Sequence, residues 1–292
     1  EFLKRLRALV DEYPGKTTVG EIGDSQHQLE LMAKYTAGHE RLHMAYTFDY
    51  LGGEFSADHF RKSIVATETA AADGWLCLAF SNHDVVRHVS RWAVHGQEQA
   101  LTRLTAMMLL TMKGSVCIYQ GEELGLTEAE LAFEDLADPY GIEFWPQFKG
   151  RDGCRTPMVW QAQVRHGAFS TAAKTWLPVP MDHLTRAVDT QDGVEGSVLE
   201  FYRAMLAFRK AHPVLAKGGI RILESGENVL AFVRYGLGEE LLCVFNMSAE
   251  PGEFVLPEGM APLSVDAPGV ATSPVDGRIE LEPFGGYVGK VG

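Results

Sequence analysis

Short apolar runs alternate with helical segments along roughly the first 215 residues. The apolar runs are TTVGE, LHMAYTF, WLCLAF and SVCIYQ, which are too short and too evenly apolar for surface strands. Around them lie the helical segments EFLKRLRALVDE, QHQLELMAKY, ADHFRKSIVATETAA, QEQALTRLTAMMLLTM and GSVLEFYRAMLAFRKAH. Evenly apolar strands suit a parallel sheet covered by helices. The alternation therefore predicts an α/β fold, either a (β/α)8 barrel or a doubly wound sheet.

Two stretches break this alternation. Residues 120–195 are rich in Pro, Gly and Trp and show no clear periodicity, and a loop of this length in a compact domain usually has a function. Farther on, alternating apolar residues are interrupted by turn signals at Ser225–Asn228 and Gly236–Glu240. We therefore expect a small antiparallel β domain over residues 217–292.

Composition excludes several classes of function. With 46% hydrophobic and 22% charged residues, the 292-residue chain is globular. Its net charge of −13 argues against a nucleic-acid partner and fits a neutral substrate. No apolar run is long enough for a membrane span, so no membrane partner is expected. The four cysteines form no C-x-x-C pair, which predicts neither a zinc site nor a redox pair.

Acidic residues follow all four apolar runs: Glu21, Asp49, Asp84 and the pair Glu122–Glu123. In either α/β fold these positions meet at the carboxyl edge of the sheet, where ligands bind. A fold has little structural reason to gather like charges. Paired carboxylates suit glycoside hydrolysis, although an ordinary turn at Asp84 and a supporting role for Glu122 and Glu123 remain open alternatives.

Five motifs in chain order resemble the later part of an α-glucosidase of the α-amylase superfamily, glycoside hydrolase family 13. They are VGEIGD, HMAYTFDYLG, FSNHDVVR, SVCIYQGEELGL and GRDGCRTPMVW. The last is similar to a loop of the α-glucosidase and oligo-1,6-glucosidase branch. The resemblance implies that residues 1–216 are the second half of a (β/α)8 barrel, strands five to eight. Residues 217–292 would then be the family's C-terminal β-sandwich domain.

The resemblance also implies roles for individual residues. Glu21 would be the general acid/base, and Asp84 the carboxylate that stabilises the transition state. His83 and Arg151 would bind the glucose ring. Arg87, the last residue of FSNHDVVR, is expected together with Arg151 to supply positive charge near the carboxylates and hydrogen bonds to the glucose.

Part of the family pattern is missing. Members carry the nucleophilic aspartate after strand four, in a motif like GFRxD, and no such motif occurs here. We therefore expect a separate or cleaved N-terminal half to complete the barrel and supply the nucleophile, and expect this chain alone to be inactive. No cofactor is expected in this chain, and any calcium site would lie in the N-terminal half.

The function expected is that of a retaining α-glucosidase acting on the non-reducing end of small α-glucosides, by hydrolysis or transfer. One alternative is a sucrose-converting or transglycosylating relative on the same scaffold. Another is a non-catalytic, amylase-like partner subunit. We expect a cytoplasmic location for such an enzyme, with a periplasmic location as the alternative.

Overall fold

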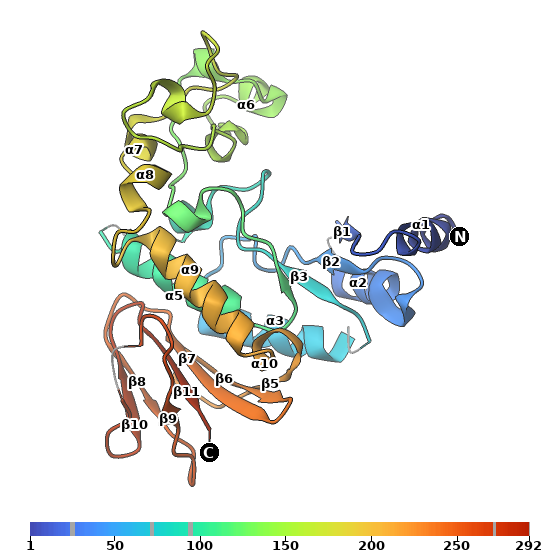
Figure 1. Ribbon diagram of the computed structural model, residues 1–292, viewed down its shortest axis with the longest axis vertical. Coiled ribbons are helices and arrows are strands. Elements are labelled where there is room, and N and C mark those ends of the chain that lie inside the picture. Colours follow the sequence, from blue (N-terminus) through green and yellow to red (C-terminus); the bar gives the residue numbers. More distant parts are fainter. Residues whose placement is uncertain (24–26, 71–72, 93–95, 271–272, 292) are drawn as a thin grey trace. The chain divides into compact units, whose positions relative to one another are not determined.

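A four-stranded parallel sheet forms the first part of the protein. The computed structural model describes residues 1–23, 27–70, 73–92, 96–270 and 273–291. The strands are β1 (Val19–Glu21), β2 (Met44–Tyr46), β3 (Leu76–Leu78) and β4 (Ser115–Val116), and every neighbouring pair is parallel. Their order in the sheet, β1-β2-β3-β4, follows the chain without reversal (Figure 1). A doubly wound sheet reverses its strand order at a switch point, so this order favours the barrel type of α/β winding.

Helices separate the successive strands. In chain order the helical elements up to β4 are α1 (Phe2–Asp11), α2 (Gln28–Thr36), η1 (Ala37–His39), α3 (Ala57–Ala70), α4 (His88–Arg91) and α5 (Glu98–Thr111). Each parallel connection thus contains at least one helix, as the alternating sequence pattern predicts. The apolar side of α3 is buried through Phe60 and Ile64, which fits its amphipathic repeat.

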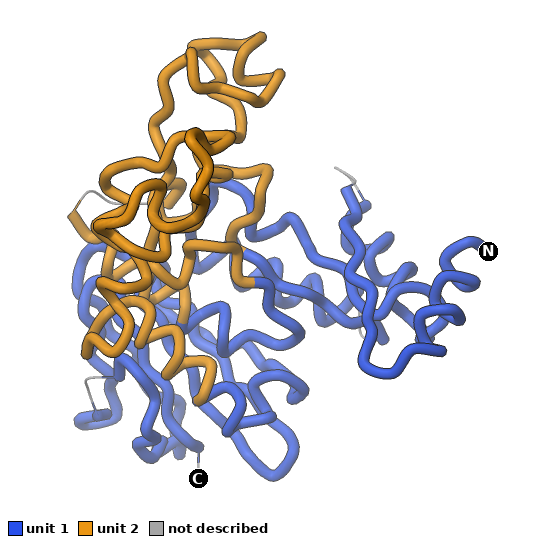
Figure 2. Tube along the Cα trace, turned by 45° about the horizontal axis from the view of Figure 1, so that its top comes forward, with its two compact units in different colours: residues 1–79, 107–117, 208–292 blue, residues 80–106, 118–207 orange. Residues whose placement is uncertain are grey.

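The chain forms two compact units (Figure 2). The first contains residues 1–79, 107–117 and 208–292, and the second contains residues 80–106 and 118–207. The predicted domain boundary at residues 216 and 217 falls within α10 (Val214–Lys217), inside the first unit.

The second unit contains the long segment after β4. It consists of short helical turns: η2 (Glu122–Leu124), η3 (Phe133–Asp135), α6 (Pro139–Glu143), η4 (Asp152–Cys154), η5 (Arg165–Ala168), α7 (Met181–Leu184) and α8 (Val188–Gln191). The longer helix α9 (Val198–Ala211) follows. A small core of Leu124, Leu126, Val159, Ala187 and Leu199 joins distant parts of this segment.

The C-terminal part of the first unit is antiparallel, as predicted. A five-stranded sheet has the order β5-β6-β7-β11-β9, and β8 pairs with β10. The strands are β5 (Gly219–Ile222), β6 (Val229–Gly236), β7 (Glu239–Asn246), β8 (Gly252–Val255), β9 (Leu263–Ser264), β10 (Arg278–Leu281) and β11 (Gly286–Lys290). The β6–β7 turn has positive φ at Leu237 and Gly238, the geometry of a tight hairpin turn.

Alternate residues of β6 face two different cores. Val229, Ala231 and Val233 belong to a cluster with residues of β7, β8, β10 and β11. One residue of the other face is Arg234, which is fully buried. Its guanidinium donates instead to the carbonyls of Thr111, Val214, Leu215, Gly218 and Gly219. Arg209 similarly donates to the carbonyls of Leu110, Met112, Gly114 and Leu215. The two arginines thus donate to carbonyls in the last turns of α5 and α10 and in the segments that follow them.

Candidate active site

Glu21 and Asp49 lie at the carboxyl edge of the parallel sheet. Glu21 is the last residue of β1, is exposed, and pairs in register with Tyr46 at the end of β2. Asp49 follows β2 by three residues, and burial raises the pKa of its carboxyl above the ordinary value. His59 Nε2 donates to the Asp49 carbonyl at 2.8 Å, which fixes this loop against α3. Two of the predicted strand-end carboxylates therefore belong to one edge, as parallel strands require.

Asp84 lies in the second unit, in the turn that follows β3 along the chain. Asn82 Oδ1 accepts a hydrogen bond of 2.8 Å from the Asp84 N–H, which is a local Asx turn. Ser81 Oγ accepts from the His88 N–H at 2.9 Å and also bonds the His88 ring at Nδ1. These bonds fix the backbone before and after Asp84, and the fixed backbone sets the position of the Asp84 side chain.

Two arginines converge on the Asp84 carboxylate. Arg155 Nη2 donates to Asp84 Oδ1 at 2.6 Å, and Arg151 Nη1 donates to the same oxygen at 3.2 Å. Arg155 Nε also donates to the His83 carbonyl at 2.6 Å. The His83 ring lies beside them, with Nε2 3.6 Å from Asp84 Oδ1. The structure thus brings together three of the predicted site residues, namely His83, Asp84 and Arg151.

Arg151 is itself held by a buried carboxylate. Asp138 accepts three hydrogen bonds from Arg151, from its backbone N–H at 2.8 Å and from Nε and Nη2 at 2.9 Å each. The side-chain bonds from Arg151 lower the pKa of the Asp138 carboxyl to about 2. A guanidinium held along one edge by a bidentate carboxylate has a fixed plane, so Arg151 presents its remaining nitrogen, Nη1, to Asp84 in one orientation.

Arg87 has a different environment from the other predicted residues. It is almost fully buried, and Nη1 and Nη2 donate to the carbonyls of Gln120 at 2.7 Å and Cys154 at 3.0 Å. Its backbone N–H donates to Glu128 Oε2 at 2.9 Å. These partners are loop segments, so the geometry favours a bracing role, and direct contact with a sugar stays a prediction.

The acidic pair after β4 stabilises its own turn. Glu122 Oε2 accepts from the Tyr119 N–H at 2.7 Å, and Glu123 Oε2 accepts from the Gly121 N–H at 2.8 Å. Burial raises the pKa of the Glu123 carboxyl. This arrangement agrees with the supporting role that the sequence left open for both residues.

An open cavity of about 560 Å³ in the second unit is lined by His83 and Arg155. Its other walls include aromatic side chains, Tyr119, Trp160, Phe169 and Trp176. Trp160 and Trp176 are 49% and 59% exposed, so their rings are accessible from the cavity. Flat aromatic faces beside hydrogen-bonding groups suit the apolar faces and hydroxyls of sugar rings.

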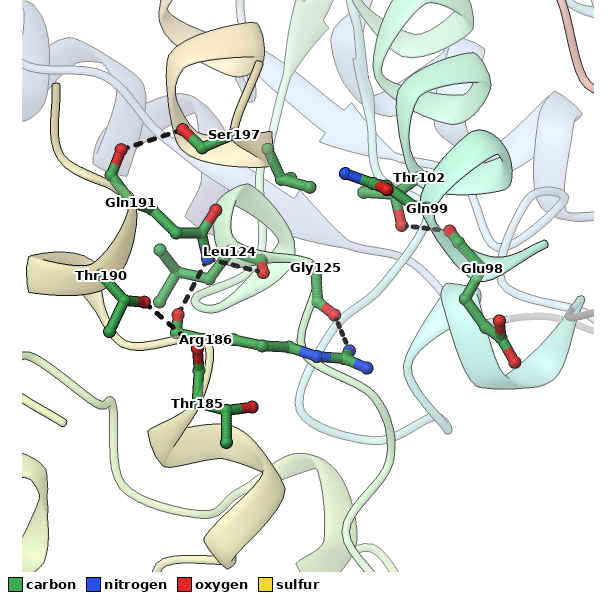
Figure 3. Close-up of a pocket in the computed structure, with 11 residues that line it drawn as sticks. Glu98, Gln99, Thr102, Leu124, Gly125, Thr185, Arg186, Thr190, Gln191 and Ser197 are labelled. Carbon is green, nitrogen blue, oxygen red and sulfur yellow. Dashed lines mark hydrogen bonds between the residues drawn. The ribbon is translucent and has the colours of Figure 1, made fainter. Parts of the chain in front are cut away.

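A second cavity, of about 390 Å³, contains none of the predicted site residues (Figure 3). Its polar side chains bond to nearby backbone: Arg186 donates to the Gly125 carbonyl, and Gln191 Nε2 donates to the Leu124 carbonyl at 3.1 Å. These side chains therefore connect loops to one another. The turn at Asp84 is the better candidate for the active site.

Sequence reasoning did not select Arg155 or Asp138. Arg155 lies four residues beyond Arg151 within GRDGCRT, so a second arginine in the same loop was the available signal. Nothing local marks Asp138, because its partner Arg151 is thirteen residues away.

Residues 1–218 match the family model described as alpha amylase, catalytic domain. The chain belongs to the α-amylase family. Among curated α-amylase-family relatives it is 47% identical to a probable alpha-glucosidase of Rhizobium meliloti, over 100% of this chain and 53% of that protein. It is 28% identical to an oligo-1,6-glucosidase of Bacillus cereus, over 97% of this chain and 55% of the relative.

Solved structures also match the chain over its full length. The alpha-glucosyl transfer enzyme XgtA matches with a TM-score of 0.92 and 44% identity, over 100% of this chain and 54% of that chain. The trehalulose synthase MutB of Pseudomonas mesoacidophila MX-45 matches with a TM-score of 0.85 and 26% identity, over 100% of this chain and 58% of that chain. The chain thus spans about half the length of the relatives it matches. No helix among the described residues is both long and apolar enough to cross a membrane.

Proposed function

We propose that this chain supplies the acid/base half of a retaining α-glucosidase, which cleaves or transfers α-linked glucose from the non-reducing end of small saccharides. The observation that supports it best is the pair of arginines on Asp84, with His83 alongside. A carboxylate oriented by two guanidinium groups beside an open aromatic cavity suits recognition of a glucose ring. Membership of the α-amylase family and the identity to a probable alpha-glucosidase give the reaction class.

In the proposed mechanism Glu21 acts first as an acid. It protonates the glycosidic oxygen while an aspartate from another segment attacks the anomeric carbon. Asp84 accepts hydrogen bonds from hydroxyls of the ring and stabilises its developing positive charge. Glu21, now ionised, removes a proton from water or from an acceptor hydroxyl in the second step. His83 and Arg151 hold the ring, and Arg87, which donates to the Cys154 carbonyl, braces the segment that carries Arg151.

The proposed architecture is the second half of a (β/α)8 barrel, residues 1–216, followed by a β-sandwich over residues 217–292. The chain-order parallel sheet and the antiparallel sheets support it. The proposed partner is the N-terminal half of the same enzyme, which brings the nucleophile and any calcium site. Without it the chain is inactive under this proposal. No nucleic-acid or membrane partner and no cofactor are proposed for this chain, and its proposed location is cytoplasmic or periplasmic.

A transferring or sucrose-converting enzyme is the second candidate. It is favoured by XgtA, described as an alpha-glucosyl transfer enzyme, and by MutB, whose mutant was crystallised with the substrate sucrose. Product analysis separates the candidates. Free glucose from maltose supports hydrolysis, new disaccharides support transfer, and an isomer of sucrose supports conversion.

The deciding experiment uses the complete enzyme with Glu21→Gln. We expect turnover of maltose to fall about 10²–10⁴-fold, the usual contribution of a general acid. An aryl glucoside with a good leaving group should lose less in its first step, and azide should restore its turnover by giving α-glucosyl azide. Unchanged turnover of maltose by Glu21→Gln would reject the assignment. The matched control is Glu12→Gln, an exposed acid just after α1 that should leave turnover unchanged.

A further inference from the structure

Two short segments of the second unit exchange hydrogen bonds through neighbouring residues. The Asp138 carboxylate of one segment accepts from Nε and Nη2 of Arg151 in the other. Asp152, the residue after Arg151, reverses this direction, because its Oδ2 accepts from the backbone N–H groups of Ala137 and Asp138 at 2.7 Å each. Asp152 is buried, so these bonds are shielded from water. The segment that contains Arg151 therefore fixes the backbone of the residue that clamps Arg151.

The same two segments touch through their backbones. A Cβ atom added at Gly150 would lie 2.8 Å from the Cα of Gly141, and one added at Gly141 would lie 2.6 Å from a carbonyl oxygen of the other segment. Gly150 also has a φ of +79°, a conformation that favours glycine. Close backbone contact and the two bonds to Asp152 together set the spacing of the segments, and with it the distance from Asp138 to Arg151.

We propose that Asp152 is a positioning residue for the candidate active site, acting through Asp138 on the orientation of Arg151. This inference rests on the proposed function, in which Arg151 binds the glucose ring. Without the Asp152 carboxylate, the N–H groups of Ala137 and Asp138 lose an acceptor, and the Asp138 carboxylate is free to turn away from Arg151. Because Nη1 of Arg151 donates to Asp84 at 3.2 Å, the contact between these two site residues is lost with it.

Hydrogen exchange of the full chain tests the structural step without a substrate. In Asp152→Ala the amides of Ala137 and Asp138 should exchange about tenfold faster than in the parent, because a protecting hydrogen bond is removed. Asp152→Asn keeps one carbonyl oxygen and should keep the protection. If Asp152→Ala does not fold, Asp152→Leu, which has a similar shape but no acceptor, gives the same comparison. Unchanged exchange of both amides in the folded variant would overturn the proposal.

The matched control for exchange is Asp189→Ala. The Asp189 carboxylate of the same unit accepts from the Ala162 N–H at 2.9 Å, and its removal should leave the amides of residues 137 and 138 unchanged. Faster exchange of these two amides in the control as well would show that the effect is not specific to Asp152 and would overturn the proposal.

Kinetics of the complete enzyme test the effect on the site. Per folded molecule, Asp152→Ala should lower kcat/KM for maltose about tenfold, and Asp152→Asn should lower it less than about twofold. Adding Asp152→Ala to Arg151→Ala should cause no further loss, because the first residue acts through the second. Additive losses, or an unchanged kcat/KM in an Asp152→Ala enzyme that only unfolds more easily, would overturn the proposal. A parent enzyme without turnover of α-glucosides would instead refute the proposed function, and the exchange rates would still decide whether Asp152 holds Asp138.

Discussion

Arg155 and Asp84 share a hydrogen bond of 2.6 Å between Nη2 and Oδ1. The same guanidinium also holds the His83 carbonyl through Nε, so one arginine fixes both residues of the turn that carries the candidate site. Arg151 donates to the same Asp84 oxygen, at 3.2 Å, and its other side-chain hydrogen bonds go to Asp138. Arg155 is therefore the stronger constraint on where His83 and Asp84 lie.

Arg155→Ala in the complete enzyme should reduce kcat/KM by about tenfold to a hundredfold, because small displacements of a reacting group have effects of this size. The free energy of unfolding should change by no more than about 1 kcal/mol, since the pair is partly exposed. Arg155→Lys keeps the charge but loses the second bond, so its loss should be intermediate. Steady-state kinetics and urea unfolding measure both quantities. A variant with parental kcat/KM would show that Arg155 has no positioning role.

Asp138 should make stability depend on pH in the acid range. Its lowered pKa means that the folded protein favours the carboxylate more strongly than the unfolded chain does. The stabilisation is complete above the unfolded pKa near 4 and disappears as the pH falls toward about 2. At pH 6, Asp138→Asn should unfold with about 1–2 kcal/mol less free energy than the parent, and the difference should shrink below pH 4. Urea unfolding from pH 3 to 7 tests this, and a constant difference would contradict it.

Arg234 should contribute strongly to stability. Replacing it by Met removes hydrogen bonds to the buried carbonyls of Thr111, Val214 and Gly218, and we expect a loss of roughly 3–5 kcal/mol in the free energy of unfolding. Arg221→Met is the matched control. It lies in the same sheet but is exposed and stacks on Tyr235, so it should change stability by less than about 1 kcal/mol. Similar losses in both variants would refute the role given to Arg234.

The aromatic cavity should affect binding more than chemistry. Trp176→Ala removes a ring that lines it, and we expect KM for small saccharides to rise about fivefold with kcat within about twofold. Phe133→Ala is the control, because Phe133 is a similarly exposed ring of the same unit outside the cavity lining. A fall in kcat without a change in KM would place Trp176 in a different role.

The sequence predicted the regular elements well and the side-chain partners poorly. Each apolar run contains one strand; WLCLAF, for example, contains β3. These elements could be predicted because the apolar runs of buried strands and the repeats of helices are local sequence patterns. The Glu21 and Asp84 turns follow their strands as expected. Arg155 and Asp138 were missed because they lie in a segment without periodicity and their partners, Asp84 and Arg151, are distant in sequence. The burial of Arg87 could not be read locally either, since it depends on the carbonyls of Gln120 and Cys154.

The buried arginines have a consequence for how the protein unfolds. Arg234 belongs to β6, yet its guanidinium donates hydrogen bonds to backbone carbonyls of α5 and α10. Arg209 of α9 donates to carbonyls at the end of α5 and at Gly114, the residue before β4. Separating the C-terminal sheet from these helices would expose several carbonyls and two guanidinium groups at once. The sheet and helices of the first unit should therefore melt as a single cooperative step, and proteolysis should not release a folded β domain from them.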